Sequence, residues 1–139
     1  ESPEEHRKIF EFFKSSLTDY LKRFPQANTF PAFLIREHYN VIKYEAGQAF
    51  HSIHSDYYPF GFLSRRHLTG IAFLNDVEKG GELYFPHQDL TVKAEAGKML
   101  IFPSGWTHVH KTFPPIDQKR YVFQVWWSFE TDDSQTESG

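Results

Sequence analysis

The chain contains no cysteine among its 139 residues, which excludes disulfides, thiolate zinc sites and iron–sulfur clusters but leaves the redox compartment open. It also lacks an apolar run of the roughly 20 residues that a membrane span requires, and no signal-peptide pattern opens it. We therefore expect a soluble protein with no membrane partner, and the cytoplasm is the favoured location. Because the chain begins at Glu1 rather than Met, we interpret it as a fragment of a longer or processed protein.

The chain also lacks an excess of basic charge, because it has 15 Lys and Arg residues and 18 Asp and Glu residues, and its net charge is −3. The basic residues are scattered, so no nucleic-acid partner is expected. The hydrophobic content of 40% and aromatic content of 18% are those of one domain, over residues 1–139, that is large enough to bury its own core.

The N-terminal segment has the pattern of a helix. Ser2-Pro3-Glu4-Glu5 reads as a capping box with proline at the first helical position, and apolar residues then recur at helical spacing. This pattern predicts one amphipathic supporting helix over residues 1–25.

After Pro31 the pattern changes to short β-rich runs separated by turn signals such as Gly47 and Gly80-Gly81. About eight short strands predict a mainly β (α+β) fold, a jelly roll or barrel over residues 31–129, with a polar, flexible tail over 130–139. The predicted strands are Phe33–Ile35, Val41–Tyr44, Phe50–His54, Leu68–Leu74, Leu83–Phe85, Leu90–Lys93, Met99–Phe102, Thr107–His110 and Tyr121–Phe129.

The segment His54-Ser55-Asp56 is a candidate metal site. Residues two apart on a strand share a face, so His54 and Asp56 can close on one ion, and His110 can add a third ligand. Two imidazoles and one carboxylate leave coordination positions open, an arrangement associated with non-haem Fe(II) oxygenases. The His-x-Asp spacing alone is weak evidence for a metal site, because His87-Gln88-Asp89 has the same spacing. We interpret that second segment, which follows Pro86, as a polar turn.

The segment Trp106–His110, a loop, and the run Arg120–Trp127 predict a hairpin that places His110 beside Arg120. Even spacing puts Arg120 and Trp126 on the same face. An arginine that faces a barrel interior is costly unless an anion meets it, and a carboxylate fits the planar guanidinium fork. The sequence therefore predicts an acid-binding charge beside the metal site.

From about Val41 to Phe129 the chain resembles the Fe(II)- and 2-oxoglutarate-dependent oxygenases, and most closely the prolyl 4-hydroxylase-like branch with its small phage and bacterial members. The motifs that carry the resemblance occur in the family's order. They are Tyr44, the Gly47 turn, His54-Ser55-Asp56, Phe73-Leu74-Asn75, the run Gly80–Pro86, the run Gly97–Pro103, His110 and Arg120-Tyr121.

The resemblance implies a double-stranded β-helix with His54, Asp56 and His110 as iron ligands. It makes Arg120 the partner of the far carboxylate of 2-oxoglutarate. His108 is a rival third ligand, but the family's spacing of about ten residues between the distal histidine and the basic residue favours His110.

Further positions line the cosubstrate site by the same resemblance. Tyr44 falls where the family often has a tyrosine that hydrogen-bonds the cosubstrate, and Trp126 would form a wall of the pocket. Phe73 replaces a frequent tyrosine, so one hydrogen bond to the cosubstrate carboxylate, worth about 1.5–3 kcal/mol, would be missing. Arg66 and His51 match positions that contact substrate in relatives.

The implied activity is hydroxylation of an unactivated C–H bond by O2, with release of succinate and CO2. The implied cofactors are Fe(II) and 2-oxoglutarate, with ascorbate as a further candidate. The substrate is a peptide or small molecule, and peptidyl proline is the first hypothesis. The aromatic residues that follow the metal motif, Tyr57, Tyr58, Phe60 and Phe62, fit either a core or a flap over the substrate. The rivals are a non-catalytic jelly-roll module that binds sugar or protein and a nucleic-acid demethylase, which would need a basic groove.

Overall fold

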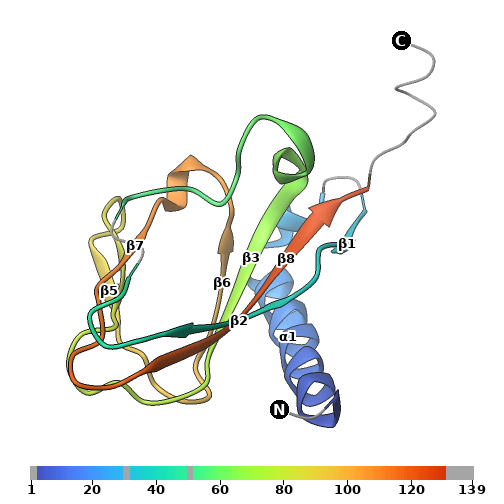
Figure 1. The fold of residues 1–139 in the computed structure, drawn as a ribbon. Helices are drawn as coiled ribbons and strands as arrows, with labels where there is room; N and C mark the ends of the chain where they lie inside the picture. The colour runs from blue at the N-terminus through green and yellow to red at the C-terminus, as the bar shows by residue number, and fades with distance from the viewer. Residues whose placement is uncertain (1–2, 30–31, 50–51, 131–139) are drawn as a thin grey trace.

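The computed structural model describes residues 3–29, 32–49 and 52–130. Two antiparallel sheets face each other, and one long helix covers the outer face of the larger sheet (Figure 1). The fold is thus a jelly roll with an N-terminal helix, as predicted. No helix in the described ranges combines the length and the apolar character that a membrane crossing needs.

The helix α1 (Pro3–Arg23) packs against the larger sheet through Phe13, which is fully buried. Gly70 makes this close approach possible. A Cβ atom at Gly70 would lie 2.8 Å from the rings of Phe13 and Trp127 and 2.9 Å from Val125. The predicted capping residue Ser2 lies outside the described residues, and the helix ends two residues before Pro25, close to the predicted end.

The larger sheet has the order β1-β8-β3-β6, and β2 pairs with β8 next to β1. The long strand β8 alternates strictly: Arg120, Val122, Gln124 and Trp126 line an internal cavity, while Phe123, Val125 and Trp127 pack under α1. This alternation is the period of two expected for a strand with a different environment on each face. The strands are β1 (Phe33–Ile35), β2 (Asn40–Tyr44), β3 (Arg66–Phe73), β6 (Met99–Pro103) and β8 (Arg120–Phe129).

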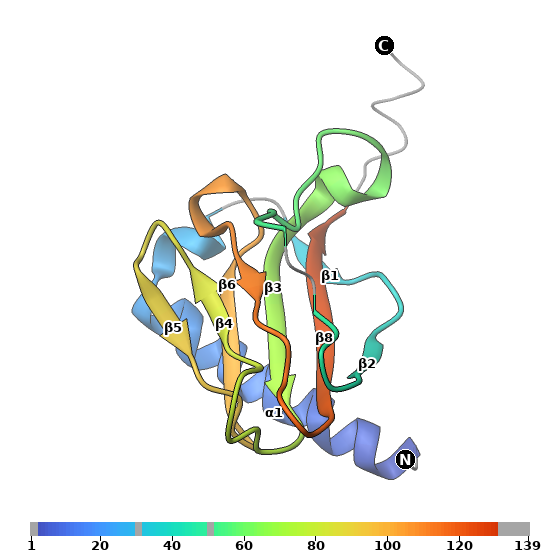
Figure 2. The same cartoon turned by 60° about the vertical axis from the view of Figure 1, so that its left-hand side comes forward.

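The smaller sheet has the order β5-β4-β7 and stands opposite the larger one (Figure 2). A second apolar cluster, which includes Phe73, Val77, Leu83 and Phe102, fills part of the space between the sheets. The strands are β4 (Leu83–Phe85), β5 (Leu90–Val92) and β7 (Lys111–Thr112), and short 3-10 helices occupy Pro25–Asn28, Gly61–Arg65 and Trp106–His108.

One predicted strand needs correction, and the predicted tail falls almost entirely outside the described residues. The segment predicted as a strand over Phe50–His54 is no strand in its described part; His54 makes a single bridge to His110, and the chain then turns because the amides of Asp56 and Tyr57 both donate to the Ser104 carbonyl. The remaining residues of that segment, 50–51, lie outside the described ranges, as does the predicted flexible tail from residue 131 onward.

The predicted hairpin between Thr107–His110 and β8 is also wrong. Residues Trp106–His108 form a 3-10 helix, in which the His108 amide donates to the Gly105 carbonyl. The strand β7 that follows pairs with β4, whereas β8 belongs to the opposite sheet. The connection through Pro114 and Pro115 therefore crosses between sheets, and His110 and Arg120 reach the same cavity from opposite sides.

Candidate active site

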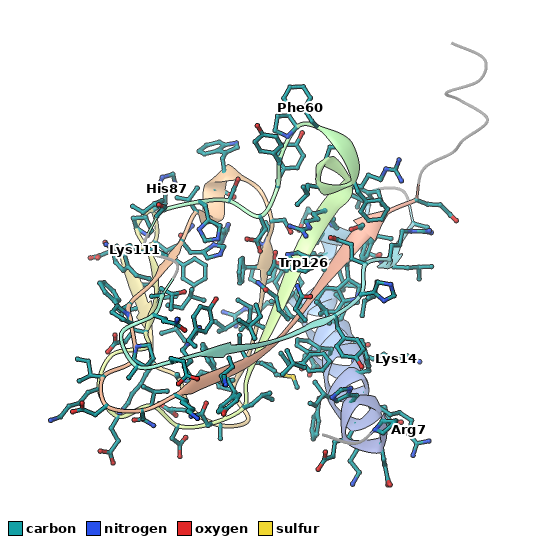
Figure 3. The ribbon with its side chains drawn as sticks, viewed as in Figure 1. Arg7, Lys14, Phe60, His87, Lys111 and Trp126 are labelled. Carbon is teal, nitrogen blue, oxygen red and sulfur yellow. The ribbon has the colours of Figure 1, made fainter. Side chains whose placement is uncertain are left out.

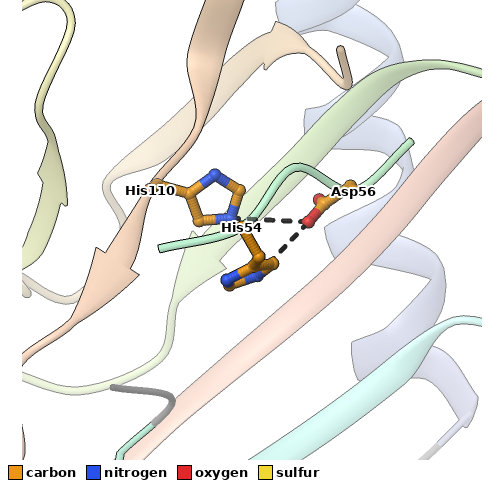
Figure 4. A group of neighbouring side chains, drawn as sticks. All are labelled: His54, Asp56 and His110. Carbon is orange, nitrogen blue, oxygen red and sulfur yellow. Dashed lines mark ion pairs between the residues drawn. The ribbon is translucent and has the colours of Figure 1, made fainter. Parts of the chain in front are cut away.

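Three potential metal ligands, His54, Asp56 and His110, converge inside the jelly roll (Figure 4). Asp56 Oδ1 lies 3.6 Å from His54 Nε2 and 3.4 Å from His110 Nε2, and the three ligand atoms all lie within 4.8 Å of one another. The main chain brings the histidines together, because His54 and His110 exchange both backbone hydrogen bonds, at 3.0 and 2.9 Å. The predicted triad is thus assembled in space.

Both imidazoles are oriented by backbone carbonyls. His54 Nδ1 donates to the Ser52 carbonyl and His110 Nδ1 to the His108 carbonyl, each at 2.9 Å. A carbonyl can only accept, so the proton of the neutral ring sits on Nδ1 and the lone pair of Nε2 points to the centre of the triad. This arrangement fixes the ring orientation and tautomer of metal-binding histidines in general.

The two oxygens of the Asp56 carboxylate have different contacts. Its Oδ2 accepts hydrogen bonds from Thr69 Oγ1 at 2.8 Å and from Trp126 Nε1 at 3.0 Å. Its Oδ1 faces the two Nε2 atoms. One oxygen is therefore anchored by the protein, and the other is available as a metal ligand.

The electrostatics keep this carboxylate ionised. Burial alone would raise the pKa of Asp56, but the hydrogen bond and charge of His110, with the hydrogen bonds from Trp126 and Thr69, outweigh burial and lower the pKa to about 2. For His110, burial lowers the pKa, and the neighbouring Asp56 carboxylate more than compensates, so the net shift is upward. An anionic carboxylate between two imidazole nitrogens suits a divalent cation.

A cavity of about 450 Å³ adjoins the triad, and Arg120 forms part of its wall. Only 2% of the Arg120 surface is exposed, its Nε has no hydrogen-bond partner among the described residues, and burial lowers its pKa despite the opposing effect of Tyr44. A buried guanidinium with an unused donor fits the carboxylate of a dicarboxylic acid such as 2-oxoglutarate, whose size the cavity can hold.

The remaining residues predicted for the cosubstrate site separate into two groups. Tyr44 lines the cavity, and its ring centroid lies 4.9 Å from Arg120 Cζ. Trp126 also lines the cavity and points into the molecule (Figure 3). Phe73, by contrast, is buried in the apolar cluster outside the cavity lining, and its ring centroid lies 5.5 Å from Arg120 Cζ.

The two predicted substrate contacts have different outcomes. Arg66 lines the cavity, but its guanidinium is already bound by Glu37. His51 lies outside the described residues.

The rival histidines lie away from the triad. His108 lines a separate, mostly apolar cavity and offers its backbone carbonyl, not its ring, to His110. His87 lies at the periphery beside Trp106 (Figure 3), and no second group of metal-ligating side chains occurs in the described part of the chain. The choice of His110 over His108 therefore agrees with the geometry.

The aromatic residues after the metal motif are exposed, so the core interpretation of them is wrong. Tyr57 is 40%, Tyr58 57%, Phe60 70% and Phe62 41% exposed. Tyr58 lines the cavity, and Phe60 lies against Tyr58 with their ring centroids 5.7 Å apart. Tyr58 and Phe60 thus form an exposed aromatic rim that begins at the cavity wall.

Sequence reasoning missed the residues that support Asp56. Thr69 faces the carboxylate from a strand that is otherwise apolar over Leu68–Phe73, and this interruption on the cavity-facing side was the available signal. Ser104, which hydrogen-bonds Thr69 at 2.8 Å, and Glu37, which binds Arg66, lie in loops and give no periodic signal.

A jelly roll that holds two histidines and one aspartate beside a buried arginine defines the class of non-haem metal oxygenases that take an acidic cosubstrate. The sequence profile of the 2OG-Fe(II) oxygenase superfamily matches residues 39–128. The chain belongs to this superfamily. Membership, together with the fit of the triad and of Arg120, supports Fe(II) and 2-oxoglutarate as its metal and cosubstrate.

Two curated relatives are plant proteins from Arabidopsis thaliana. Prolyl 4-hydroxylase 13 is 30% identical, over 70% of this chain and 44% of the relative. Probable prolyl 4-hydroxylase 9 is 28% identical, over 65% of this chain and 40% of the relative. The chain thus spans less than half the length of the curated relatives it matches.

Solved structures of similar fold include further prolyl hydroxylases. The viral collagen prolyl hydroxylase of Paramecium bursaria Chlorella virus-1, solved with 2OG, has a TM-score of 0.71 at 17% identity and covers 89% of this chain and 74% of its own. A Trichoplax adhaerens prolyl hydroxylase, in complex with a hypoxia inducible factor peptide, has a TM-score of 0.67 at 17% identity and covers 94% and 60%. At these identities the likeness shows the fold.

Proposed function

We propose that this chain is the catalytic domain of a 2-oxoglutarate-dependent dioxygenase that hydroxylates an unactivated C–H bond of a peptidyl proline. One observation carries the proposal: the triad of His54, Asp56 and His110 and the buried Arg120 share one cavity. The triad supplies a facial set of ligands, and Arg120 supplies the charge that a dicarboxylic cosubstrate requires.

When bound, Fe(II) lets O2 oxidise 2-oxoglutarate to succinate and CO2, so that one oxygen atom enters succinate and the other enters the C–H bond. The chain's own residues orient the cosubstrate and exclude competing reactions. Arg120 and Tyr44 hold the far end of the cosubstrate. Ile71, Leu83 and Val122 line the cavity with apolar groups that restrict water.

The proposal of a prolyl substrate is supported by the names of the relatives and by the exposed rim. The curated relatives are named prolyl 4-hydroxylases. Tyr58 lines the cavity and Phe60 packs against it, and both present exposed aromatic faces, which is the kind of surface on which proline-rich segments pack. The rim is thus suited to hold an extended peptide over the triad.

The test is succinate formation from 2-oxoglutarate under Fe(II) and O2, with and without a proline-rich peptide, followed by mass analysis of the peptide for one added oxygen atom. We expect His54→Ala and Arg120→Ala to abolish turnover. His87→Ala is the matched control, because His87-Gln88-Asp89 repeats the spacing of the metal motif outside the cavity, and its turnover should equal that of the wild type.

Absence of both turnover and binding of metal and 2-oxoglutarate would favour a non-catalytic jelly-roll module instead. Turnover of 2-oxoglutarate that no proline peptide stimulates, and that leaves every peptide unmodified, would retain the oxygenase and refute the prolyl substrate.

A further inference from the structure

An ion pair between Arg66 and Glu37 lies beside the metal site, and Arg66 lines the same cavity as the triad. Arg66 Nε donates to Glu37 Oε2 at 2.8 Å and Nη2 donates to Oε1 at 2.6 Å. The Arg66 side chain is 12% exposed and the Glu37 side chain 20%. The contact is therefore a partly buried two-point fork, the strongest geometry available to an arginine and a carboxylate.

The pair crosses the strand β8. Arg66 begins β3, which pairs with one edge of β8, whereas Glu37 lies between β1 and β2, which pair with the other edge. The guanidinium passes over the indole ring of Trp126 on its way, with Cζ 3.7 Å from the ring centroid. The ion pair thus acts as a strap that fixes Trp126 against β8.

The strap is connected to Asp56 in two ways. Arg66 Nη1 donates to the Asp56 main-chain carbonyl at 3.1 Å, and Trp126 donates through Nε1 to Asp56 Oδ2 at 3.0 Å. The guanidinium therefore holds the main chain of this residue directly and its side chain through the indole. Loss of either contact would reduce the constraints that aim Oδ1 at the two histidines, although Thr69 would still donate to Oδ2.

We propose that Glu37 and Arg66 are positioning residues that set the metal affinity of the triad by holding Asp56 in place. The inference rests on the proposed role of His54, Asp56 and His110 as metal ligands. Glu37 balances the charge of Arg66, so this guanidinium differs from that of Arg120, which forms no ion pair with any described residue. Arg66 stabilises the geometry of the site, and Arg120 serves as the acid-binding charge.

The experiment titrates Co(II) into the metal-free protein and follows the visible absorption of the bound ion. Glu37→Gln keeps the size of the side chain but weakens the fork, and we expect about tenfold weaker Co(II) binding, in line with other residues that orient metal ligands. Arg66→Lys keeps the charge without the fork and tests the same connection if Glu37→Gln fails to fold. Unchanged Co(II) affinity in the folded variants would overturn the inference.

The matched control is Arg36→Gln. Arg36 lies next to Glu37 and forms an ion pair with Glu130 at 3.0 Å, but Glu130 is 62% exposed and the pair does not touch the triad. The Arg36 side chain is 26% exposed, so the pair is open to solvent mainly at Glu130, and because it does not contact Asp56 the Co(II) affinity should stay within about twofold of the wild type. An equal loss in Arg36→Gln would show that any disturbance of this loop weakens metal binding and would refute a specific role for Glu37.

A double substitution separates positioning from a general structural effect. If Glu37 acts through Arg66, Glu37→Gln should weaken Co(II) binding no further in a chain that already carries Arg66→Ala, whereas additive losses would contradict the strap. His54→Ala distinguishes the two proposals. Wild-type Co(II) affinity in His54→Ala would refute the metal site itself, and loss there with wild-type affinity in Glu37→Gln would refute the strap alone.

Discussion

Replacement of Arg120 by methionine should weaken cosubstrate binding while it stabilises the metal-free fold. Arg120 is 2% exposed, burial lowers its pKa, and no described carboxylate pairs with it. Methionine is of similar length and apolar, so it removes a buried charge that no described carboxylate neutralises and that Tyr44 compensates only in part. We expect the free energy of unfolding without ligands to rise by on the order of 1–3 kcal/mol.

The same substitution removes both arms of the guanidinium fork. Two hydrogen bonds to a carboxylate are worth roughly 3–6 kcal/mol together, so 2-oxoglutarate binding should weaken by about 100-fold to 10,000-fold. Co(II) affinity in the absence of 2-oxoglutarate should be unchanged, because Arg120 is not a ligand. Opposite signs for stability and cosubstrate affinity distinguish a binding residue from a structural one.

The assays are urea unfolding of the metal-free protein and calorimetric titration of 2-oxoglutarate in the presence of Co(II). Lys119→Met is the matched control, because it removes the adjacent but exposed cation, and both measurements should stay near the wild-type values. Loss of more than about 2 kcal/mol of stability in Arg120→Met would show that the charge is satisfied within the fold and would refute the reasoning.

The other predictions concern pH, packing and the cosubstrate tyrosine. The pKa of Asp56 falls from 3.8 to about 2 on folding, so its ionised form stabilises the metal-free protein. This contribution is about 2 kcal/mol above pH 3.8 and is lost as the pH falls through about 2. Urea unfolding should therefore show the stability difference between wild type and Asp56→Asn shrinking from pH 5 to pH 2, and a constant difference would contradict the assigned ionisation. Gly70→Ala should lower the free energy of unfolding by about 1–3 kcal/mol, because its Cβ would lie 2.8 Å from Phe13. Gly105→Ala, whose Cβ would have nothing within 4 Å, should change it little, and equal urea midpoints for the two variants would disprove the tight helix packing. Tyr44→Phe should raise the KM for 2-oxoglutarate by about 3-fold to 10-fold with little change in kcat, as expected for one lost hydrogen bond, and an unchanged KM would remove Tyr44 from the cosubstrate site.

The strands that sequence predicted well are those whose environment repeats along the chain. The segments Phe33–Ile35 and Leu83–Phe85 match the observed strands, and β8 differs from its predicted range by one residue. In β8 the alternation of cavity-facing and helix-facing side chains is present in the sequence itself, so local pattern and tertiary environment agree.

The predictions failed where hydrogen bonds to residues distant in the sequence determine the main-chain conformation. His54 and His110 were assigned to strands, but each makes only one bridge, to the other. The bridge is set by the crossing of residues 113–119 between sheets and by the two amides that turn onto Ser104, and neither feature has a local signature. The triad itself was predictable because the sequence contains residue types that bind metals and the spacing between the distal histidine and the basic residue that is typical of the family.

The ion pair between Glu37 and Arg66 illustrates a second limit of prediction from sequence. Glu37 and Arg66 lie far apart in the sequence and meet only because β1, β8 and β3 are neighbours in the sheet. Arg66 could be recognised as a candidate, but its partner decides whether the charge is free for a ligand. Only the fold supplies that partner.

The reciprocal backbone bonds between His54 and His110 have an evolutionary consequence. Because two backbone hydrogen bonds join these positions, they would stay side by side if other side chains replaced the imidazoles. A descendant that lost its imidazoles would still present a lined cavity with an arginine at its wall. The geometry that brings the two ligand positions together is thus separable from the chemistry of the side chains that they carry.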